Sequence, residues 1–176
     1  QENPIIAGVR RKAVQTKIPS LIIMLALATG SAVQAASDQY WGDSYLFFSV
    51  DKLDEATIAD FFTFGGGADA LIYKGLGVNV DLGYQFVRND FASGVGLTSF
   101  DGCYHFVNRA KPAKLVPYVV AGYAIAFRSG HVNLFNYGAG VNYWFSRHVG
   151  FRGEIRDYRA HRYDWGVGFR LGLAFR

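Results

Sequence analysis

The last segment of the chain alternates strictly between large apolar residues and small ones. Trp165, Val167, Phe169, Leu171, Leu173 and Phe175 occupy one set of alternate positions, and Gly166, Gly168, Arg170, Gly172 and Ala174 occupy the other. Because successive side chains of a β-strand point to opposite faces, this pattern predicts a strand with one wholly apolar face. That face has to meet an apolar environment, which is either a protein core or lipid.

A weaker form of the same alternation recurs along the chain from Tyr40 onward. Segments of roughly ten residues are separated by turn-like clusters, which is typical of transmembrane β-barrels. Before the final strand, these segments cover residues 45–50, 61–72, 78–86, 100–106, 119–127, 135–145 and 148–156. The pattern predicts an all-β fold, an eight-stranded antiparallel transmembrane β-barrel arranged as an up-and-down meander.

The residues opposite the apolar face decide which side of the barrel is inside. They are mostly Gly and Ala with a few charges of both signs, a combination that suits a narrow lumen better than a surface in water. We therefore expect the charges to neutralise one another and to plug the lumen. The predicted interior network consists of Asp69, Asp81, Asp101, Arg152, Glu154, Arg156 and Arg170. The predicted lipid-facing residues include Phe169, Leu171, Leu173, Phe175, Phe135, Tyr137, Val141 and Tyr143.

Aromatic residues gather near the ends of the predicted strands, as in the interfacial girdles of membrane barrels. They are Trp41, Tyr73, Phe86, Phe106, Tyr118, Phe127, Phe135, Tyr143, Phe145, Trp165 and Phe175. With both chain ends in the periplasm, the outer connections are expected at residues 52–60, 88–96, 128–131 and 157–164. The inner turns are expected at residues 74–75, 108–114 and 146–147.

Residues 10–35 have the three parts of a secretory signal peptide. A basic stretch, Arg10 to Lys12, precedes the apolar run Leu21 to Ala28, and Val33 to Ala35 provides a small-residue cleavage site. The alternative is a short buried helix, but that helix would lack a polar face. We therefore expect an N-terminal extension and cleaved signal peptide over residues 1–35, followed by an outer-membrane barrel domain over residues 36–176.

The charge balance argues against a nucleic-acid partner. The formal net charge is +4, and Arg10, Arg11, Lys12, Lys17 and Glu2 together contribute +3 of it within the predicted leader. The remaining chain has no excess of Lys and Arg that would form a basic surface for DNA or RNA.

The single cysteine excludes an internal disulfide and a CxxC site, and we interpret Cys103 as a small, half-buried strand residue. No cofactor and no metal are expected. His105, His131, His148 and His161 are the candidates for acid–base chemistry, and Ser129 beside His131 in an outer loop is compatible with a lipid A hydrolase. Such catalysis needs a third group that orients the base, and none is evident. We therefore predict no catalytic residue and no enzyme.

Three segments carry a resemblance to a known family. They are Pro117 to Gly122, Gly138 to Phe145, and Val149 to Tyr158, which follow one another before an aromatic-rich last strand. In this order they resemble the OmpA-like small outer-membrane β-barrel superfamily, over about residues 38–176 and most specifically in the second half. The resemblance implies a barrel of the Gram-negative cell outer membrane.

The first hypothesis for the function is a structural or surface-interaction barrel that supports the envelope or presents short loops. The alternatives are a narrow, gated, porin-like channel and a soluble periplasmic barrel that binds a ligand as lipocalins do. The expected partners are outer-membrane lipid and lipopolysaccharide, together with the barrel-assembly machinery during insertion. The protein is expected to be a monomer.

Overall fold

The structure is a computed structural model that describes residues 41–53, 61–107, 113–160 and 164–176. The predicted signal peptide lies outside the described residues. The strands are β1 (Gly42–Leu53), β2 (Phe61–Tyr73), β3 (Leu76–Val87), β4 (Asp90–His105), β5 (Leu115–Phe127), β6 (His131–Trp144), β7 (Val149–Ala160) and β8 (Asp164–Phe175). Within the described ranges, no helix is long and apolar enough to cross a membrane.

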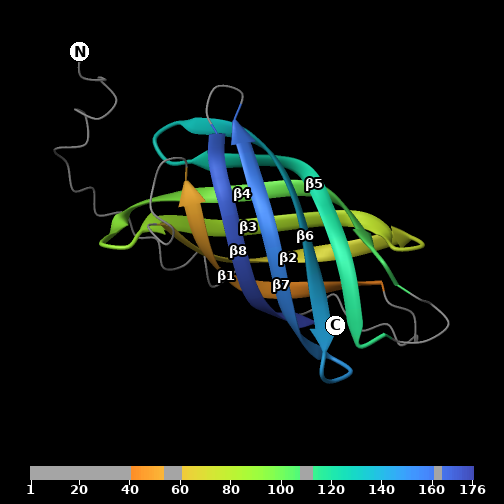
Figure 1. Ribbon diagram of the computed structural model, residues 1–176. Helices are drawn as coiled ribbons and strands as arrows, with labels where there is room; N and C mark the ends of the chain where they lie inside the picture. Colours follow the sequence, from red (N-terminus) through yellow and green to blue (C-terminus); the bar gives the residue numbers. More distant parts are fainter. Residues whose placement is uncertain (1–40, 54–60, 108–112, 161–163) are drawn as a thin grey trace, which may run out of the picture. The chain divides into compact units, whose positions relative to one another are not determined.

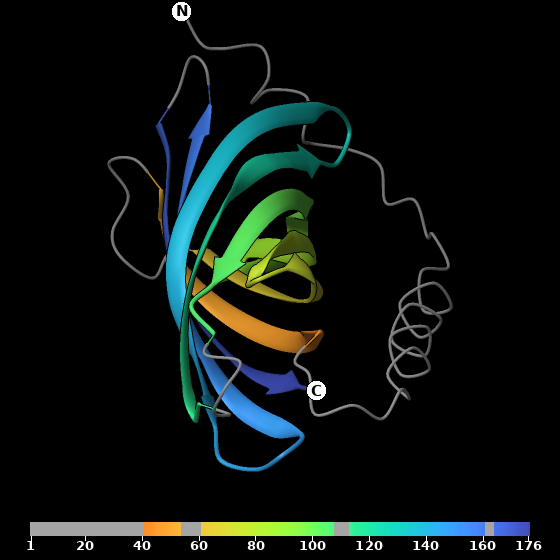
Figure 2. The ribbon, with the colours of Figure 1, turned by 90° about the vertical axis from the view of Figure 1, so that its right-hand side faces the viewer.

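The strands form a closed antiparallel barrel in sequence order (Figure 1). β1 closes the barrel by pairing with β8, from Ser44 opposite Phe175 to Leu53 opposite Gly166. In the view turned by 90°, the curved strands lie side by side and form the wall of the barrel (Figure 2). Closure matters because a free sheet edge would leave a row of unpaired backbone N–H and C=O groups. The predicted eight-stranded meander is confirmed.

Burial alternates along the strands, and it is the reverse of burial in a soluble barrel. On β5, Val116, Tyr118 and Val120 are buried, whereas Leu115 and Val119 are exposed. Across the described residues, many large apolar side chains on the outer wall are more than two-fifths exposed, and Leu171 reaches 73%. Inside lie many charged and amide side chains, among them Asp81, Asn136 and Arg156. A lipocalin-like barrel would need the opposite arrangement, with an apolar lumen and a polar exterior.

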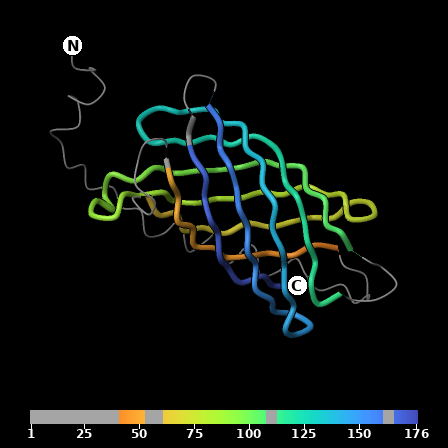
Figure 3. The backbone as a smooth tube through the Cα atoms, viewed as in Figure 1, coloured from red at the N-terminus to blue at the C-terminus, as the bar shows by residue number. Residues whose placement is uncertain are grey.

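The two ends of the barrel are distinguished by their turns (Figure 3). The terminal end holds the start of β1, the end of β8, and the turns after Tyr73 and after Trp144. The far end holds the turn at Arg88 and Asn89 and the turn at residues 128–130. In the first of the terminal turns, Lys74 and Gly75 adopt positive φ angles of 47° and 92°, which closes the tight hairpin between β2 and β3.

Several strands are longer than the sequence predicts. β4 begins at Asp90, so the outer connection predicted over residues 88–96 is wrong, and only Arg88 and Asn89 lie between β3 and β4. Apart from Phe91 and Leu97, residues 90–99 carry small or polar side chains on both faces, so their alternation is too weak to predict a strand. β7 likewise continues to Ala160, beyond the expected strand end at Arg156, and it shortens the predicted connection over 157–164.

Candidate functional site

The seven residues of the predicted interior network are all buried, and the structure brings them together along the lumen. Their carboxylates project from β2, β3, β4 and β7, and their guanidinium groups project from β7 and β8. Residues far apart in the sequence therefore meet because the barrel wall curves around them.

Arg156 lies at the centre of this network and is fully buried. Its Nε donates to Oε1 of Glu154 at 2.5 Å, and its Nη1 donates to Oδ2 of Asp101 at 2.9 Å and also to Asp81. Arg170 reaches the same cluster, since its Nη1 donates to Oδ2 of Asp81 at 3.1 Å. These contacts join β3, β4, β7 and β8 across the lumen.

Arg152 forms a second centre, nearer the terminal end. Its guanidinium carbon lies 3.9 Å from the centroid of the Tyr45 ring and 4.1 Å from that of Tyr118, so the cation is held between two aromatic faces. Its Nη1 donates to Oδ2 of Asp69 at 2.7 Å, and its Nη2 donates to Oε2 of Glu154 at 3.3 Å. The Tyr118 hydroxyl also donates to Oε2 of Glu154, at 2.7 Å. Glu154 therefore links the two centres.

A carboxylate near the far end, that of Asp51, is hydrogen-bonded by neutral side chains instead of by arginines. Asp51 is buried and accepts hydrogen bonds from the Ser49 hydroxyl at 2.5 Å, the Thr63 hydroxyl at 2.5 Å and the Gln85 amide at 3.1 Å. These donors are neutral, so Asp51 gains hydrogen bonds without a countercharge.

The interior as a whole contains more acidic than basic groups. Among the described residues, the buried acids are Asp43, Asp51, Asp69, Asp81, Asp101 and Glu154, and the buried arginines are Arg152, Arg156 and Arg170. His105 is also buried and lies with its Nε2 3.3 Å from Oδ2 of Asp69. Six carboxyl groups therefore face three guanidinium groups.

Apolar clusters pack toward both ends of this charged region. One, toward the terminal end, consists of Tyr45, Phe47, Val116, Trp144 and Ala174. Another, toward the far end, consists of Leu97, Ala124, Ala126, Leu134 and Tyr158. With these side chains and the ion-pair network inside it, the described part of the barrel is filled by its own residues.

Glycines on the inner face make room for the larger polar groups. A Cβ at Gly67 would lie 2.5 Å from the Tyr45 hydroxyl, and a Cβ at Gly140 would overlap the Tyr118 hydroxyl. These two phenols contact Asp81 and Glu154, so the absence of a side chain at either glycine allows a hydrogen bond of the network. The Gly65 to Gly67 run in β2 thus permits close packing inside the barrel.

The interior network also has members that the sequence pattern does not predict. They are Asp43, Tyr45, Asp51, Asn79, His105, Tyr118, Asn136, Asn142 and Tyr158. Tyr118 was predicted to lie in an interfacial girdle, but it is 1% exposed and points inward. Its position in the alternation, on the same face as Val120, would have given the correct side.

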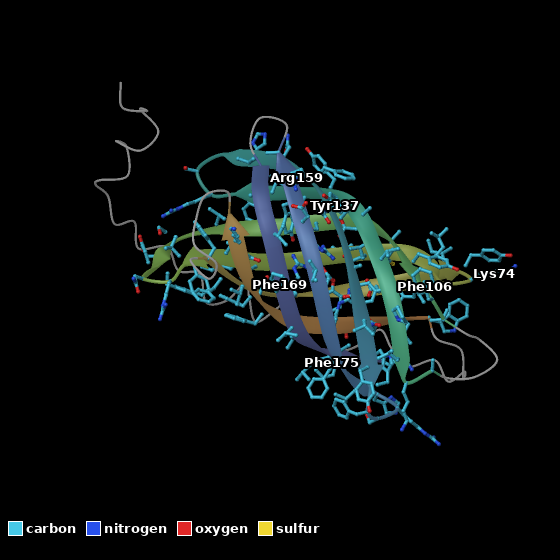
Figure 4. All side chains as sticks on the ribbon, in the orientation of Figure 1. Lys74, Phe106, Tyr137, Arg159, Phe169 and Phe175 are labelled. Carbon is cyan, nitrogen blue, oxygen red and sulfur yellow. The ribbon has the colours of Figure 1, made fainter. Side chains whose placement is uncertain are left out.

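The residues predicted to face lipid all lie on the outer wall. Phe169, Phe135, Tyr137 and Tyr143 are between 44% and 55% exposed, Leu171 and Leu173 are exposed, and Phe175 and Val141 are partly exposed. Figure 4 labels Phe169 and Phe175 on β8, Lys74 and Phe106 toward the terminal end, and Tyr137 and Arg159 toward the far end.

The histidines are divided between the surface and the interior. His131 and His148 are exposed near opposite ends of the barrel, and His161 lies outside the described residues. Ser129 is exposed in the turn before His131. His105 is buried on β4 together with Cys103, which is 2% exposed rather than half-buried as the sequence suggests.

Comparison with known proteins identifies the fold. No protein-family model and no curated protein sequence matches this chain. Among solved structures, the N-terminal β-barrel domain of Pseudomonas aeruginosa OprF is similar, with a TM-score of 0.61 and 20% identity over 76% of this chain and 95% of that one. Neisserial surface protein A is similar with a TM-score of 0.52 and 14% identity, over 76% of this chain and 94% of that one.

A third similar structure is Ail, the attachment invasion locus protein of Yersinia pestis. Its TM-score is 0.50 at 11% identity, and the match covers 76% of this chain and 96% of that one. This chain covers nearly all of each of the three structures. The chain therefore has the fold of the small OmpA-like outer-membrane β-barrels.

Proposed function

We propose that this protein is a non-enzymatic barrel of the bacterial outer membrane that supports the envelope and presents short connections at the cell surface. The observation that carries the proposal is the combination of an apolar outer wall with a lumen filled by paired charges. Such a wall gains stability in lipid, and such a lumen leaves little room for a substrate.

The dimensions of the wall fit a bilayer. A strand of 12 residues, such as β3, spans about 30 Å along the barrel axis at a rise of about 3.4 Å per residue and a tilt of about 40°. The apolar band of an outer-membrane barrel is about 25 Å high. The strands are therefore long enough to cross it with residues to spare at both ends.

The proposed orientation places the terminal end in the periplasm and the far end outside. Residues 1–35 would then comprise the N-terminal extension and the cleaved signal peptide, and the barrel-assembly machinery would insert the chain as a monomer. At the far end, Arg128 is exposed, and the Arg159 side chain is 46% exposed. These cations are suited to the phosphate groups of lipopolysaccharide, because a guanidinium group can bind a phosphate through two hydrogen bonds.

A narrow, gated, cation-selective channel is the second candidate. The excess of buried carboxyl groups over arginines favours it, because a lumen with net negative charge attracts cations. The apolar clusters and the arginine bridges oppose it, since an ion path would require several of these contacts to open together.

The decisive experiment has two stages. First, the protein is expressed in a Gram-negative host, the membranes are fractionated, and the outer-membrane fraction is run on a gel with and without boiling. We expect the protein in this fraction as a compact, fast-migrating band that shifts after boiling. A soluble, monomeric protein in the periplasmic fraction would overturn the proposal.

The second stage separates the candidate roles. Purified barrel is inserted into planar bilayers, and cells with and without the gene are compared for sensitivity to detergent and for the mass spectrum of their lipid A. We expect no unitary conductance, increased detergent sensitivity without the gene, and unchanged lipid A. Reproducible conductance steps would favour the channel, and a change in lipid A acylation would indicate an enzyme.

A further inference from the structure

Three side chains with metal-binding atoms meet inside the barrel near its terminal end. Asp69 of β2, Cys103 of β4 and His105 of β4 are all buried, and each offers one ligand atom within 4.8 Å of the others. We propose that these residues form a binding site for a thiophilic divalent metal ion of the Zn²⁺ class, which ties β2 to β4 across the intervening strand β3.

The strand geometry brings the three residues together. Cys103 and His105 are two positions apart on β4, so both point into the lumen, while Tyr104 between them is exposed. β3 separates β4 from β2, and its inward position at this level, opposite Cys103, is Gly77. Gly77 adds no side chain to the space between the two strands, so Asp69 can approach the two ligands of β4.

The distances are close to those that an ion requires. The Nε2 of His105 lies 3.3 Å from Oδ2 of Asp69. In a tetrahedral zinc site, with bonds of about 2.0 to 2.3 Å, neighbouring ligand atoms are separated by about 3.5 Å. Small side-chain adjustments would therefore place an ion between the three atoms, with a fourth position left for water.

The donor set indicates which ions fit. A thiolate, an imidazole and a carboxylate together suit Zn²⁺ and related transition ions, whereas Mg²⁺ and Ca²⁺ prefer oxygen ligands alone. On binding, the Cys103 thiol would form the metal–sulfur bond and release its proton to solvent. The interior would thus gain two positive charges and lose one proton, a net gain of one positive charge.

The charge of the interior is an independent observation that favours a bound cation. The described interior holds six buried carboxyl groups and three buried arginines, so added positive charge reduces an existing imbalance. Arg152 already donates to Oδ2 of Asp69 at 2.7 Å, but it also lies 3.5 Å from Oδ1 of Asp43 and 3.3 Å from Oε2 of Glu154. Arg152 can therefore keep a countercharge while Asp69 turns toward an ion.

The site lies near the terminal end of the barrel. His105 is the last residue of β4, and its backbone N–H donates to the Gly75 carbonyl in the turn between β2 and β3, at 2.7 Å. An ion could therefore reach the site from this end or be bound while the barrel folds. Both routes are covered by refolding the protein in the presence of the ion.

The test uses Co²⁺ as a spectroscopic substitute for Zn²⁺. The full chain is refolded in detergent micelles with and without Co²⁺, excess ion is removed, and bound metal is measured together with the absorption spectrum. We expect about one ion per folded chain and an intense near-ultraviolet band from sulfur-to-cobalt charge transfer. Zn²⁺ should displace the cobalt and abolish this band.

Matched variants distinguish this site from surface binding. Cys103→Ser keeps the size of the side chain and should abolish the charge-transfer band, and Cys103→Ala should do the same if the serine variant fails to fold. The double variant His131→Gln/His148→Gln removes two exposed histidines and should retain the band. A heat-shifted gel band confirms that each variant is folded.

The proposal is overturned by any of three results. These are a folded wild-type protein without bound cobalt after refolding with the ion, bound cobalt without the sulfur band, or the same band in a folded Cys103 variant.

Discussion

Replacing Arg156 with Met measures how strongly the interior ion pairs stabilise the barrel. Met is similar in length to the arginine stem but carries no charge, so the variant removes the guanidinium group from three buried carboxylates, those of Asp81, Asp101 and Glu154. Removal of one partner of a buried ion pair typically costs about 3–5 kcal/mol, because the remaining charge stays buried without compensation. We expect the free energy of unfolding to fall by about this amount.

The assay is urea unfolding of the barrel refolded into lipid vesicles, followed by tryptophan fluorescence and by the heat-dependent gel shift. Arg159→Met is the matched control. Arg159 also pairs with a carboxylate, Asp157, at 2.8 Å, but its side chain is 46% exposed. An exposed pair contributes about 0–1 kcal/mol, so the control should unfold almost as the wild-type protein does.

A second substitution tests the cause of the loss. In the double variant Arg156→Met/Asp101→Asn, one of the uncompensated carboxylates becomes a neutral amide. We expect it to recover part of the lost stability, with a coupling of about 0.5–3 kcal/mol between the two sites. The reasoning is refuted if Arg156→Met costs no more than Arg159→Met, or if Asp101→Asn makes the Arg156 variant less stable still.

Three further predictions use the same unfolding assay. Leu171→Arg on the outer wall should cost about 2–4 kcal/mol in vesicles if this position lies near the bilayer midplane, and an unchanged stability would mean that the wall does not face lipid. Tyr118→Phe removes the hydroxyl that donates to Glu154 and should cost about 1–3 kcal/mol, whereas no loss would show that the arginines alone satisfy this carboxylate. Arg128→Ala removes the hydrogen bond to the Ser93 carbonyl at the far end. It should speed proteolysis of the turn at residues 128–130 in intact cells, while the free energy of unfolding changes by less than about 0.5 kcal/mol.

The strands of the barrel wall could be predicted from the sequence because the alternation of apolar and small residues lies within each strand. In β8, large apolar residues alternate with glycines without interruption, so strand and face follow from period two alone. The beginning of β4 lacks this contrast, so the pattern predicts a connection there instead of a strand. In β1 both faces carry aromatic residues, so the alternation does not tell that Tyr45 points inward and Leu46 outward.

The pairings inside the lumen could not be predicted because they depend on strand register and curvature. The candidate charges were recognised by type and by face, but Arg156 meets Asp101 across the lumen, between strands that are not neighbours. Asp43 and Arg152 are joined in the same way. The cluster of Asp69, Cys103 and His105 depends on the stagger of β2 and β4 across β3, which alternation within one strand does not reveal.

The pairing of β1 with β8 has a consequence for how the protein reaches its folded state. Ser44 and Phe175 lie near opposite ends of the barrel sequence, so among the strand pairings of the described residues their contact closes the longest loop and has the largest loop-closure entropy. Contacts of such long sequence separation form slowly. Until β8 has been synthesised, β1 lacks one of its two strand partners, and the apolar outer wall cannot close. The cell therefore has to keep this chain unfolded and protected from aggregation until its last strand is available.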